Sequence, residues 1–214
     1  MSVLDSSSTS TANSDKVLFY YNPMSRGRIV HWMLEETGAE YEIKLLAWEK
    51  KEHKSPEFLK INPMGKIPAI VHKSVAVTEA AAICTYLADA FPKAGLAPAV
   101  DDPARGTYYR WLFFAASCIE PAMMDRKFPR TDPVAASHLG YGSYDDTVNA
   151  MEQAVSKGFI TGKFSAADVY MSSQIGWCMM NKDLEPRPAF EKYQKLCTER
   201  PAFQRFLQKA GSLS

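Results

Sequence analysis

Two short β-rich runs joined by a tight polar connection place the strongest constraint on the fold of this chain. The runs are Ala69–Val71 and Val75–Val77, and His72-Lys73-Ser74 lies between them. Two such runs with so short a connection predict an antiparallel hairpin. The hairpin lies within the stretch Asn62–Thr78, so the chain contains a sheet with at least one antiparallel pair of strands.

A proline marks the entrance to this hairpin. Pro63 and Gly65 interrupt the chain, and Pro68 stands immediately before the first β-rich run. Proline has no N–H, and the start of a strand is one of the few places where a sheet accommodates it. The backbone groups that precede Pro68 need partners outside the sheet. Water and a bound peptide-like ligand are the two alternatives.

The region before the hairpin alternates strands and helices. A strand over Lys16–Tyr21, a helix over Ser25–Thr37 and a strand over Tyr41–Leu46 form a predicted βαβ unit, whose crossover is expected to be right-handed. Ser25 is a good N-cap for this helix, and Gly38 is a natural stop at its C-terminal end.

One short helix and one longer helix flank the hairpin. The short helix is predicted over Ser55–Ile61, with Ser55 as its cap and Pro56 at its first position. The longer helix is predicted over Glu79–Phe91, and Pro92 ends it. The order βαβ, short helix, ββα is that of an α+β domain.

The rest of the chain predicts helices only. Ser165 and Asp168 have the spacing of a capping box. The predicted helices are Pro103–Met124, one within Asp145–Ser156, Ala166–Met180, Pro188–Cys197 and Pro201–Lys209. We therefore expect a flexible tail over residues 1–15, an α+β domain over 16–92, a linker over 93–102 and an all-helical domain over 103–214.

Composition excludes several classes of protein. The 214 residues are 46% hydrophobic and 23% charged, and a net charge of +1 argues against a nucleic-acid partner. The sequence has no apolar run long enough to cross a bilayer, so we expect no membrane partner. The four cysteines show neither a zinc-binding nor a disulfide pattern, which favours the reducing cytoplasm and predicts no metal.

The motifs together resemble those of the cytosolic glutathione transferases, over nearly the whole chain from Lys16 to Lys209. Glu52-His53-Lys54-Ser55-Pro56-Glu57-Phe58, followed by Asn62–Ala69 and then by Thr78-Glu79, is similar to the phi and theta classes of that family. Tyr21–Arg28 looks like a bacterial variant of its first loop, and Glu199–Phe203 looks like its usual tail. The resemblance implies a thioredoxin-like first domain, a helical second domain and a homodimer.

This resemblance implies glutathione as a co-substrate, whose thiol must be ionised before it can attack. A free thiol has a pKa of about 8.5, so only a small fraction is ionised at neutral pH. A hydroxyl at the start of a helix can donate to the sulfur, and the helix end adds positive potential. Ser25 fits this role, although it can instead be a plain N-cap, and a different alignment places Asn22 at the activating position.

The resemblance also assigns contacts to glutathione. His53 and Lys54 would hold the glycine carboxylate and Lys66 would make another polar contact, although a solvated charge cluster is the alternative interpretation. The remaining contacts come from the region of the hairpin: the backbone of Ile67, a cis bond before Pro68, the side chain of Glu79 and the N–H of Ala80. The family usually has serine where this chain has Ala80, so one hydroxyl contact is lost.

The second substrate is expected to be a small apolar electrophile held by the helical domain. The candidate pocket residues are all large and apolar, a residue type found more often in a core than in a pocket. They are Met24, Tyr108, Trp111, Phe114, Met123 and Trp177. The sequence thus predicts a glutathione transferase. The alternatives are a non-catalytic glutathione-binding or ligand-carrying protein, or a glutathione-dependent enzyme of other chemistry, such as ether cleavage, isomerisation or peroxide reduction.

Overall fold

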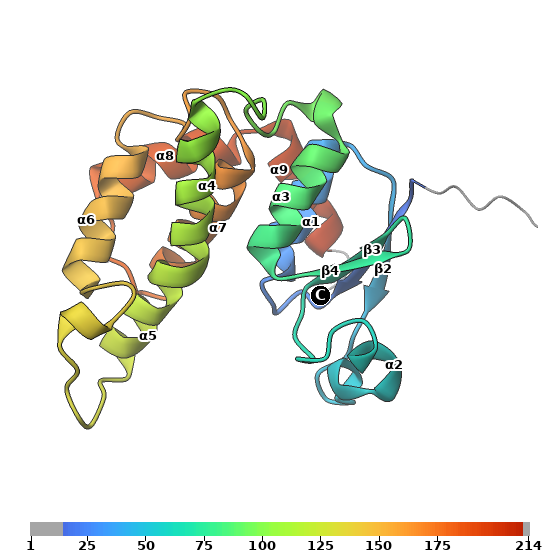
Figure 1. Ribbon diagram of the computed structural model, residues 1–214, viewed down its shortest axis with the longest axis horizontal. Helices are drawn as coiled ribbons and strands as arrows, with labels where there is room; N and C mark the ends of the chain where they lie inside the picture. Colours follow the sequence, from blue (N-terminus) through green and yellow to red (C-terminus); the bar gives the residue numbers. More distant parts are fainter. Residues whose placement is uncertain (1–14, 212–214) are drawn as a thin grey trace, which may run out of the picture.

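A computed structural model describes residues 15–211 of the chain (Figure 1). The predicted tail over residues 1–15 lies outside this part except for its last residue. Strands and helices alternate in the first part of the chain as expected. The elements are β1 (Val17–Tyr21), α1 (Gly27–Thr37), β2 (Tyr41–Leu45), α2 (Pro56–Leu59), β3 (Ala69–His72), β4 (Val75–Thr78) and α3 (Ala80–Ala90).

The strands form one mixed sheet with the order β2-β1-β3-β4. β1 runs parallel to β2, with Val17 opposite Tyr41, whereas β3 is antiparallel to both β1 and β4. Lys73 and Ser74 form the turn of the predicted hairpin, and both have positive φ angles, 49° and 65°. A two-residue turn with this backbone matches the twist of the strands that it joins. The thioredoxin-like fold is confirmed.

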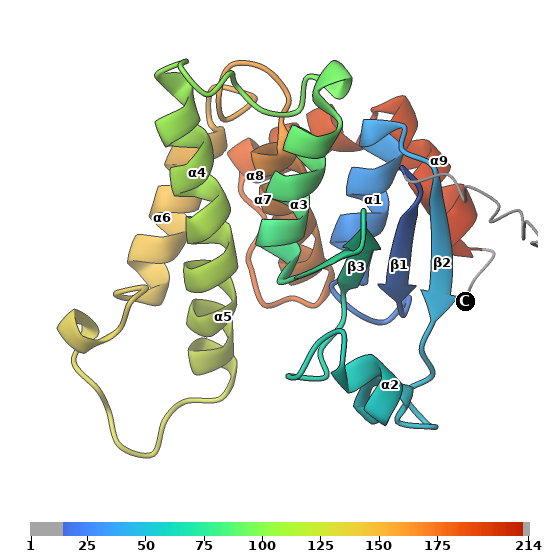
Figure 2. The same ribbon diagram turned by 45° about the vertical axis from the view of Figure 1, so that its right-hand side comes forward.

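Side chains of β1 alternate between the two faces of the sheet. Val17, Phe19 and Tyr21 are fully buried in the main core, which also contains the inner faces of α1 and α3. Tyr20 points to the opposite face and packs with Phe58 of α2 in a smaller cluster. Figure 2 shows α1 and α3 side by side and α2 away from them, below the sheet. Both faces of the sheet are therefore covered.

The remainder of the described chain is helical, as the sequence predicts. Its α-helices are α4 (Ala104–Phe114), α5 (Glu120–Lys127), α6 (Tyr144–Val155), α7 (Ala166–Met180), α8 (Pro188–Thr198) and α9 (Pro201–Gly211). Ser165 and Asp168 form the predicted capping box at the start of α7. Within residues 15–211 no helix is long and apolar enough to cross a membrane.

The predicted helix over Pro103–Met124 is continuous but not uniform. A π-helical turn over Ala115–Ile119 separates α4 from α5. Pro121 explains this turn, because it cannot donate to the carbonyl group one turn earlier and its ring would collide with that group in a regular helix. The predicted helix is therefore confirmed from Ala104 to Met124, and the π-helical turn within it was not predicted.

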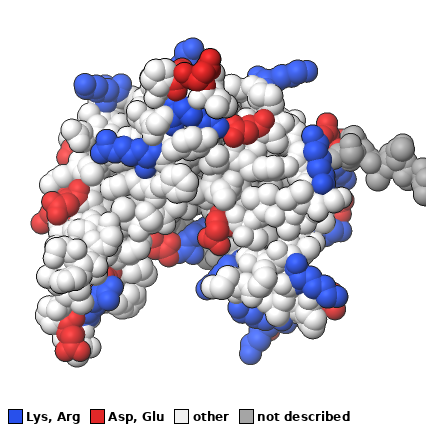
Figure 3. All heavy atoms as spheres, in the orientation of Figure 1, with Lys and Arg blue, Asp and Glu red and all other residues white. Residues whose placement is uncertain are grey.

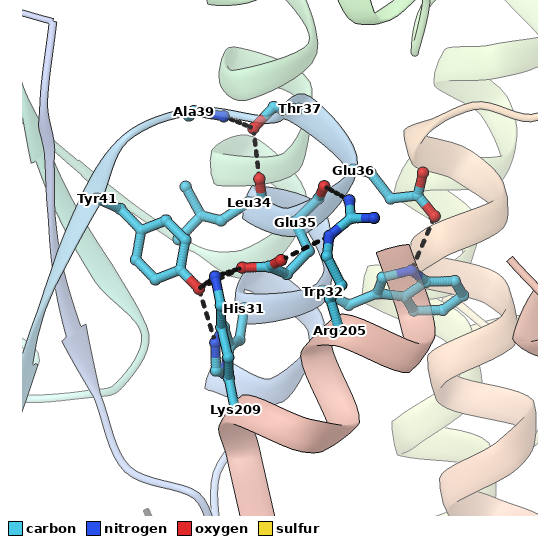
Figure 4. Close-up of polar contacts among 10 residues, drawn as sticks. All are labelled: His31, Trp32, Leu34, Glu35, Glu36, Thr37, Ala39, Tyr41, Arg205 and Lys209. Atoms are coloured by element: carbon cyan, nitrogen blue, oxygen red, sulfur yellow. Dashed lines mark hydrogen bonds and ion pairs between the residues drawn. The ribbon is translucent and has the colours of Figure 1, made fainter. Parts of the chain in front are cut away.

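α9 returns to the first part of the molecule and packs against α1 (Figure 1). Figure 4 shows the polar contacts of this packing, in which Glu35 of α1 faces Arg205 and Lys209 of α9 and also Tyr41 of β2. Lys209 Nζ lies 2.6 Å from Glu35 Oε1, and Arg205 Nε lies 3.2 Å from Oε2. The Tyr41 hydroxyl donates to the same carboxylate. The last helix is therefore tied to the first by charge as well as by apolar packing.

Candidate functional site

Three segments that the sequence singles out meet at one end of the sheet. Ala69 pairs with Tyr20 of β1 on one side and with Thr78 of β4 on the other. The end of β1, the start of β3 after Pro68 and the end of β4 before Glu79 therefore lie at the same end of the sheet. The register itself brings the β1–α1 loop, the proline entrance and the start of α3 together.

Asn22 braces the β1–α1 loop. Its side-chain amide donates to the carbonyl oxygen of Leu46 at 2.8 Å, and its Oδ1 accepts from the Met24 N–H at 2.8 Å. One amide hydrogen of Asn22 remains for a further partner. The side chain thus ties the end of β1 to the segment that follows β2, and it fixes the course of the loop toward Ser25.

Ser25 holds its hydroxyl between two backbone groups. Oγ donates to the carbonyl oxygen of Asn22 at 2.6 Å and accepts from the Gly27 N–H at 3.0 Å. The predicted N-cap at Ser25 was wrong by one residue, because α1 begins at Gly27 and Arg26 occupies the capping position. The Ser25 hydroxyl accepts from the N–H of Gly27, the first residue of α1, and not from an N–H further along the helix as a capping side chain would. Gly27 permits this geometry, since a Cβ there would lie 2.9 Å from Ser25 Oγ.

Arg26 links the β1–α1 loop to the helical part of the molecule. Its Nε donates to Glu120 Oε2 at 2.7 Å, and its terminal nitrogen contacts Oε1 of the same carboxylate. Glu120 is the first residue of α5, directly after the π-helical turn. Two N–H groups on one carboxylate fix orientation better than a single contact does. The loop that carries Ser25 is therefore attached to α5.

The predicted cis bond between Ile67 and Pro68 is confirmed. Asn62 is buried and shapes the loop before this bond, since its amide donates to the Lys66 carbonyl oxygen at 2.9 Å and its Oδ1 accepts from Met64 N–H at 3.1 Å. Ile67 lies before the first paired residue of β3, so its backbone is outside the ladder. The sequence motif contained Asn62, but its bracing role was not predicted.

The structure brings the predicted cations to this loop. Lys54 Nζ donates to the Met64 carbonyl oxygen at 2.7 Å, and the Lys66 side chain is exposed. The His53 ring lies 4.6 Å from the Trp48 ring, measured between centroids. A Cβ on Gly65, whose φ is 58°, would come within 2.6 Å of the His53 carbonyl oxygen. Glycine at this position therefore allows the close approach of the two segments.

Glu79 has a backbone conformation that side chains rarely adopt. Its φ is 64° and its ψ is 116°, at the residue that immediately precedes α3. Such a conformation costs roughly 1–3 kcal/mol in a residue other than glycine, and these residues cluster at functional sites. Glu79 is exposed, while the following Ala80 is buried. Glu79 and the first residues of α3, whose N–H groups have no partner within the helix, therefore lie at the same end of the sheet as Pro68.

A cavity of about 400 Å³ adjoins the β1–α1 loop. Residues from α1, α5, α7 and α9 form its mainly apolar walls, and Met24 and Ser25 lie at the loop side. Figure 3 shows a deep notch between the helical part and the strand-containing part on one face of the molecule, with charged atoms of both signs at its upper edge. A cavity of this size can enclose a small organic molecule.

Three of the six predicted pocket residues line this cavity, namely Met24, Met123 and Trp177. Tyr108 and Trp111 do not, because they face inward from α4 and are 0% and 5% exposed in the core. Phe114 packs partly buried against the same core. Sequence reasoning missed other lining residues, which include Arg28, Trp32, Phe203 and Phe206. The amphipathic pattern of α9 marks the two phenylalanines as inward-facing, but it does not indicate that they face a cavity.

A buried thiol also lines the cavity. Burial raises the pKa of Cys178 to about 12, so this group stays a neutral thiol at physiological pH. Cys84 and Cys197 are buried as well, and all four cysteines are free. Among residues 15–211, no three side chains of His, Cys, Asp or Glu come together as a set of metal ligands.

Comparison with known proteins places this architecture in a family. Residues 16–89 match the family described as "Glutathione S-transferase, N-terminal domain". The chain is similar to "Glutathione S-transferase Z2" from Arabidopsis thaliana, with 27% identity over 87% of this chain and 88% of the relative. It is also similar to "Disulfide-bond oxidoreductase YfcG" from Escherichia coli, with 26% identity over 89% of this chain and 94% of the relative.

A solved structure shows the same arrangement of both parts. The glutathione transferase URE2P6 from Phanerochaete chrysosporium, crystallised with oxidised glutathione, superimposes with a TM-score of 0.76. It has 28% identity, and the match covers 92% of this chain and 97% of that one. The N-terminal part of this chain, residues 16–89, therefore belongs to the glutathione S-transferase N-terminal domain family, and the chain as a whole has the fold of the glutathione transferases and is similar to them over most of its length.

Proposed function

We propose that this protein is a glutathione transferase that ionises the thiol of glutathione for attack on an apolar electrophile. The observation that carries the proposal is the meeting of the Ser25 loop, Ile67–Pro68 and Glu79 at one end of the sheet, next to an apolar cavity. Glutathione would lie along this edge with its sulfur toward the cavity. The crystallised relative URE2P6 holds oxidised glutathione, which supports this choice of ligand.

Each part of glutathione has a chemically suitable partner in this arrangement. His53, Lys54 and Lys66 would meet the glycine carboxylate, and the backbone of Ile67 would pair with the cysteinyl unit as one more strand. Glu79 would accept from the ammonium group of the γ-glutamyl unit. The N–H groups at the start of α3, Ala80 among them, would donate to its carboxylate.

Ser25 is the proposed activating residue. Its hydroxyl donates to the Asn22 carbonyl oxygen, so donation to sulfur requires a rotation about the Cβ–Oγ bond that gives up this contact. The N-terminal end of α1 adds positive potential at the same place. Asn22 remains the second candidate, although both ends of its amide already brace the loop. Ser25 lines the cavity and Asn22 does not, which supports Ser25 as the activating residue.

The reaction would begin with loss of the thiol proton to solvent. The thiolate then attacks an electrophilic carbon, a C–S bond forms, and the leaving group departs with its electron pair. Stabilisation of the thiolate and the proximity of the two substrates would provide the acceleration. Glutathione is consumed as a co-substrate, and no resident metal enters this proposal.

Thiol–disulfide exchange is a second candidate function. The observation in its favour is the similarity to the disulfide-bond oxidoreductase YfcG over most of both chains. The β1–α1 loop contains no cysteine. Two glutathione molecules would therefore have to reduce each substrate disulfide to two thiols and form one oxidised glutathione. A carrier that binds glutathione without turnover is the third alternative.

We further propose that the protein acts as a homodimer in the cytoplasm, as the family resemblance and the free cysteines favour. Light scattering on a size-exclusion column tests the first point. A mass of twice the 23.9 kDa of one chain is expected, and a mass equal to one chain would contradict it.

Glutathione binding tests the proposed site. We expect the Lys54→Ala variant to bind glutathione about tenfold more weakly in calorimetry, because one charge-assisted contact to the carboxylate is lost. Turnover at saturating glutathione should fall much less. Lys60→Ala is a matched control, since Lys60 is an exposed lysine at the end of the neighbouring α2.

A panel of electrophiles and disulfides, assayed with the wild-type protein, separates the alternatives. Conjugation supports the transferase, disulfide reduction alone supports the oxidoreductase, and binding without either supports the carrier. Equal glutathione affinity in the wild type and in Lys54→Ala would rule out Lys54 as a carboxylate contact.

A further inference from the structure

One cation in the cavity wall has no carboxylate partner in the part of the chain that the structure describes. Arg28 lines the cavity half-buried, with its guanidinium 5.0 Å from the centre of the Phe206 ring. Within residues 15–211, Arg28 and Arg110 are the two arginines that form no ion pair with a carboxylate. Arg110 is exposed and lies outside the cavity walls. Among the described residues, Arg28 is thus the one unpaired arginine that faces the cavity.

The carboxylates around the cavity are already in use. Glu120 pairs with Arg26 at the β1–α1 loop, and Asp183 pairs with Lys127 at 2.7 Å. The neighbouring Tyr21 does not compensate Arg28 either, because burial raises the pKa of its phenol and keeps it neutral. These carboxylates neutralise Arg26 and Lys127, so the positive charge of Arg28 is left without a partner among the described residues.

The position of Arg28 relates this charge to the proposed reaction. Arg28, Ile29 and Trp32 share one face of α1 and line the cavity together with Ser25, which lies just before this helix. The Arg28 N–H donates to the Ser25 carbonyl oxygen at 3.2 Å, so the two residues are one turn of the chain apart. A molecule in the cavity can therefore present one atom to the sulfur near Ser25 and an anionic group to Arg28.

We propose that Arg28 binds an anionic group of the second substrate, so that the preferred electrophile is a carboxylate with an aromatic or aliphatic body. This inference rests on the proposed function and adds an anionic group to the otherwise apolar electrophile. The body would pack against Met123, Trp177 and Phe206, which supply apolar walls. A guanidinium binds a carboxylate through two parallel N–H groups, and these contacts are stronger where the surroundings are apolar.

The test compares a carboxylate with its own methyl ester. Binding is measured by calorimetry with 3,5-dinitrobenzoate and methyl 3,5-dinitrobenzoate, which have no leaving group and need no turnover. We expect the wild-type protein to bind the carboxylate at least about tenfold more tightly than the ester, the usual effect of a hydrogen bond to a charged group. Arg28→Met should abolish this preference, and Arg28→Lys should restore part of it.

Arg110→Met is the matched control, because Arg110 also lies over an aromatic ring, 4.6 Å from the centre of Trp111. It should keep the full preference for the carboxylate. Circular dichroism of each variant checks that the fold is retained, and Arg28→Lys keeps the inference testable if Arg28→Met does not fold. Equal binding of acid and ester by the wild type, or binding of neither, would overturn the inference.

Conjugation assays keep this inference separate from the proposed function. The probes are 4-chloro-3,5-dinitrobenzoate and its methyl ester, which share the same reacting carbon and leaving group. Conjugation of both at equal KM would leave the transferase standing and refute the role of Arg28. If the protein prefers the carboxylate but does not bind glutathione, the role of Arg28 in binding an anion is supported and the transferase function is refuted. An equal loss of turnover for both probes in Arg28→Met would assign Arg28 to the thiolate instead.

Discussion

Two neighbouring polar residues have different environments at the start of α1. Asn22 uses its amide to hold two backbone segments together, whereas Ser25 makes its two contacts within a single turn of the chain. A residue that braces a loop is costly to redirect, because its partners would lose their hydrogen bonds. A hydroxyl that rotates about one bond is easier to redirect toward a ligand. This difference is the physical basis for preferring Ser25 as the activating residue.

His31 is a buried side chain that makes the stability of the fold depend on pH. It is 0% exposed, its Nε2 lies 3.0 Å from the Tyr41 hydroxyl, and burial lowers its pKa to about 4 (Figure 4). In the unfolded chain its pKa is about 6.5. As the pH falls between these values, the unfolded chain gains a proton that the folded protein does not accept. Stability is therefore complete above about pH 6.5 and falls below it, by about 3 kcal/mol in total near pH 4.

Glu35 acts in the same direction at lower pH. Burial raises the pKa of Glu35, but hydrogen bonds from Lys209 and Tyr41 outweigh burial and hold it below its ordinary value. Its stabilising effect is therefore lost as the pH falls below about 4.5.

Urea unfolding between pH 7.5 and 4.5 should show a smaller decline in the free energy of unfolding for His31→Gln than for the wild type. His138→Gln, an exposed control, should follow the wild type. Identical declines in all three proteins would contradict the account.

At the scale of elements, signals within a few residues predicted the structure well. Ser55 and Pro56 start α2 as expected, with Ser55 Oγ accepting from the Phe58 N–H at 3.2 Å, and Gly38 ends α1 with a φ of 66°. These features depend on residues that lie close together in sequence. The residues proposed to contact glutathione at the Pro68 end of the sheet were assigned from their resemblance to a family motif. This end of the sheet remains a proposal as a binding site.

Features that depend on distant segments were not predicted. The ion pair between Arg26 and Glu120 joins residues 94 positions apart, and the cavity forms only when α9 packs beside α1. The sequence does not show which inward-facing side chains of α4 will meet another helix and which will meet space. Tyr108 and Trp111 were therefore assigned to a pocket when they belong to the core.

The start of α7 depends on one buried carboxylate. Asp168 is 0% exposed and accepts from the N–H groups of Ser165 and Ile160 and from the Tyr193 hydroxyl, all within 2.9 Å. Asp168→Ala leaves these donors without a partner. We expect a loss of about 3 kcal/mol in the free energy of unfolding, measured in urea.

Asp145→Ala is the control for this prediction, because Asp145 is an exposed acid in the first turn of α6. It should cost less than about 1 kcal/mol. Similar losses in the two variants would show that burial and the number of donors do not decide the stability of these helix starts.

At the scale of the whole molecule, α1 connects the sheet to the last helices. Arg200, between α8 and α9, makes two contacts of 2.8 Å with the buried carboxylate of Glu36 and lies 3.6 Å from the centre of the Phe164 ring. Trp32 donates to the same carboxylate at 3.0 Å. The predicted boundary near residues 93–102 thus separates two parts that share contacts through α1.

Removal of this bridge should weaken the whole fold. Arg200→Met keeps the apolar stem but leaves Glu36 buried with one donor, so we expect a loss of about 2–4 kcal/mol in the free energy of unfolding. Arg187→Met is the matched control, since Arg187 pairs with Glu152 through side chains that are 32% and 37% exposed. It should cost about 1 kcal/mol or less. A smaller loss for Arg200→Met than for Arg187→Met would contradict this account of how the parts are joined.

The most direct test of the proposed function is the ionisation of bound glutathione. Thiolate absorbs in the ultraviolet, so a pH titration of the saturated complex gives the pKa of the bound thiol. We predict a value well below the 8.5 that is usual for a free thiol. Ser25→Ala should return it toward that value with little change in glutathione affinity. Ser117→Ala, which removes a hydroxyl that donates to the Phe113 carbonyl oxygen, should leave it unchanged. The same lowered pKa in Ser25→Ala and the wild type would contradict the role of Ser25, and no lowering in the wild type would contradict thiol activation itself.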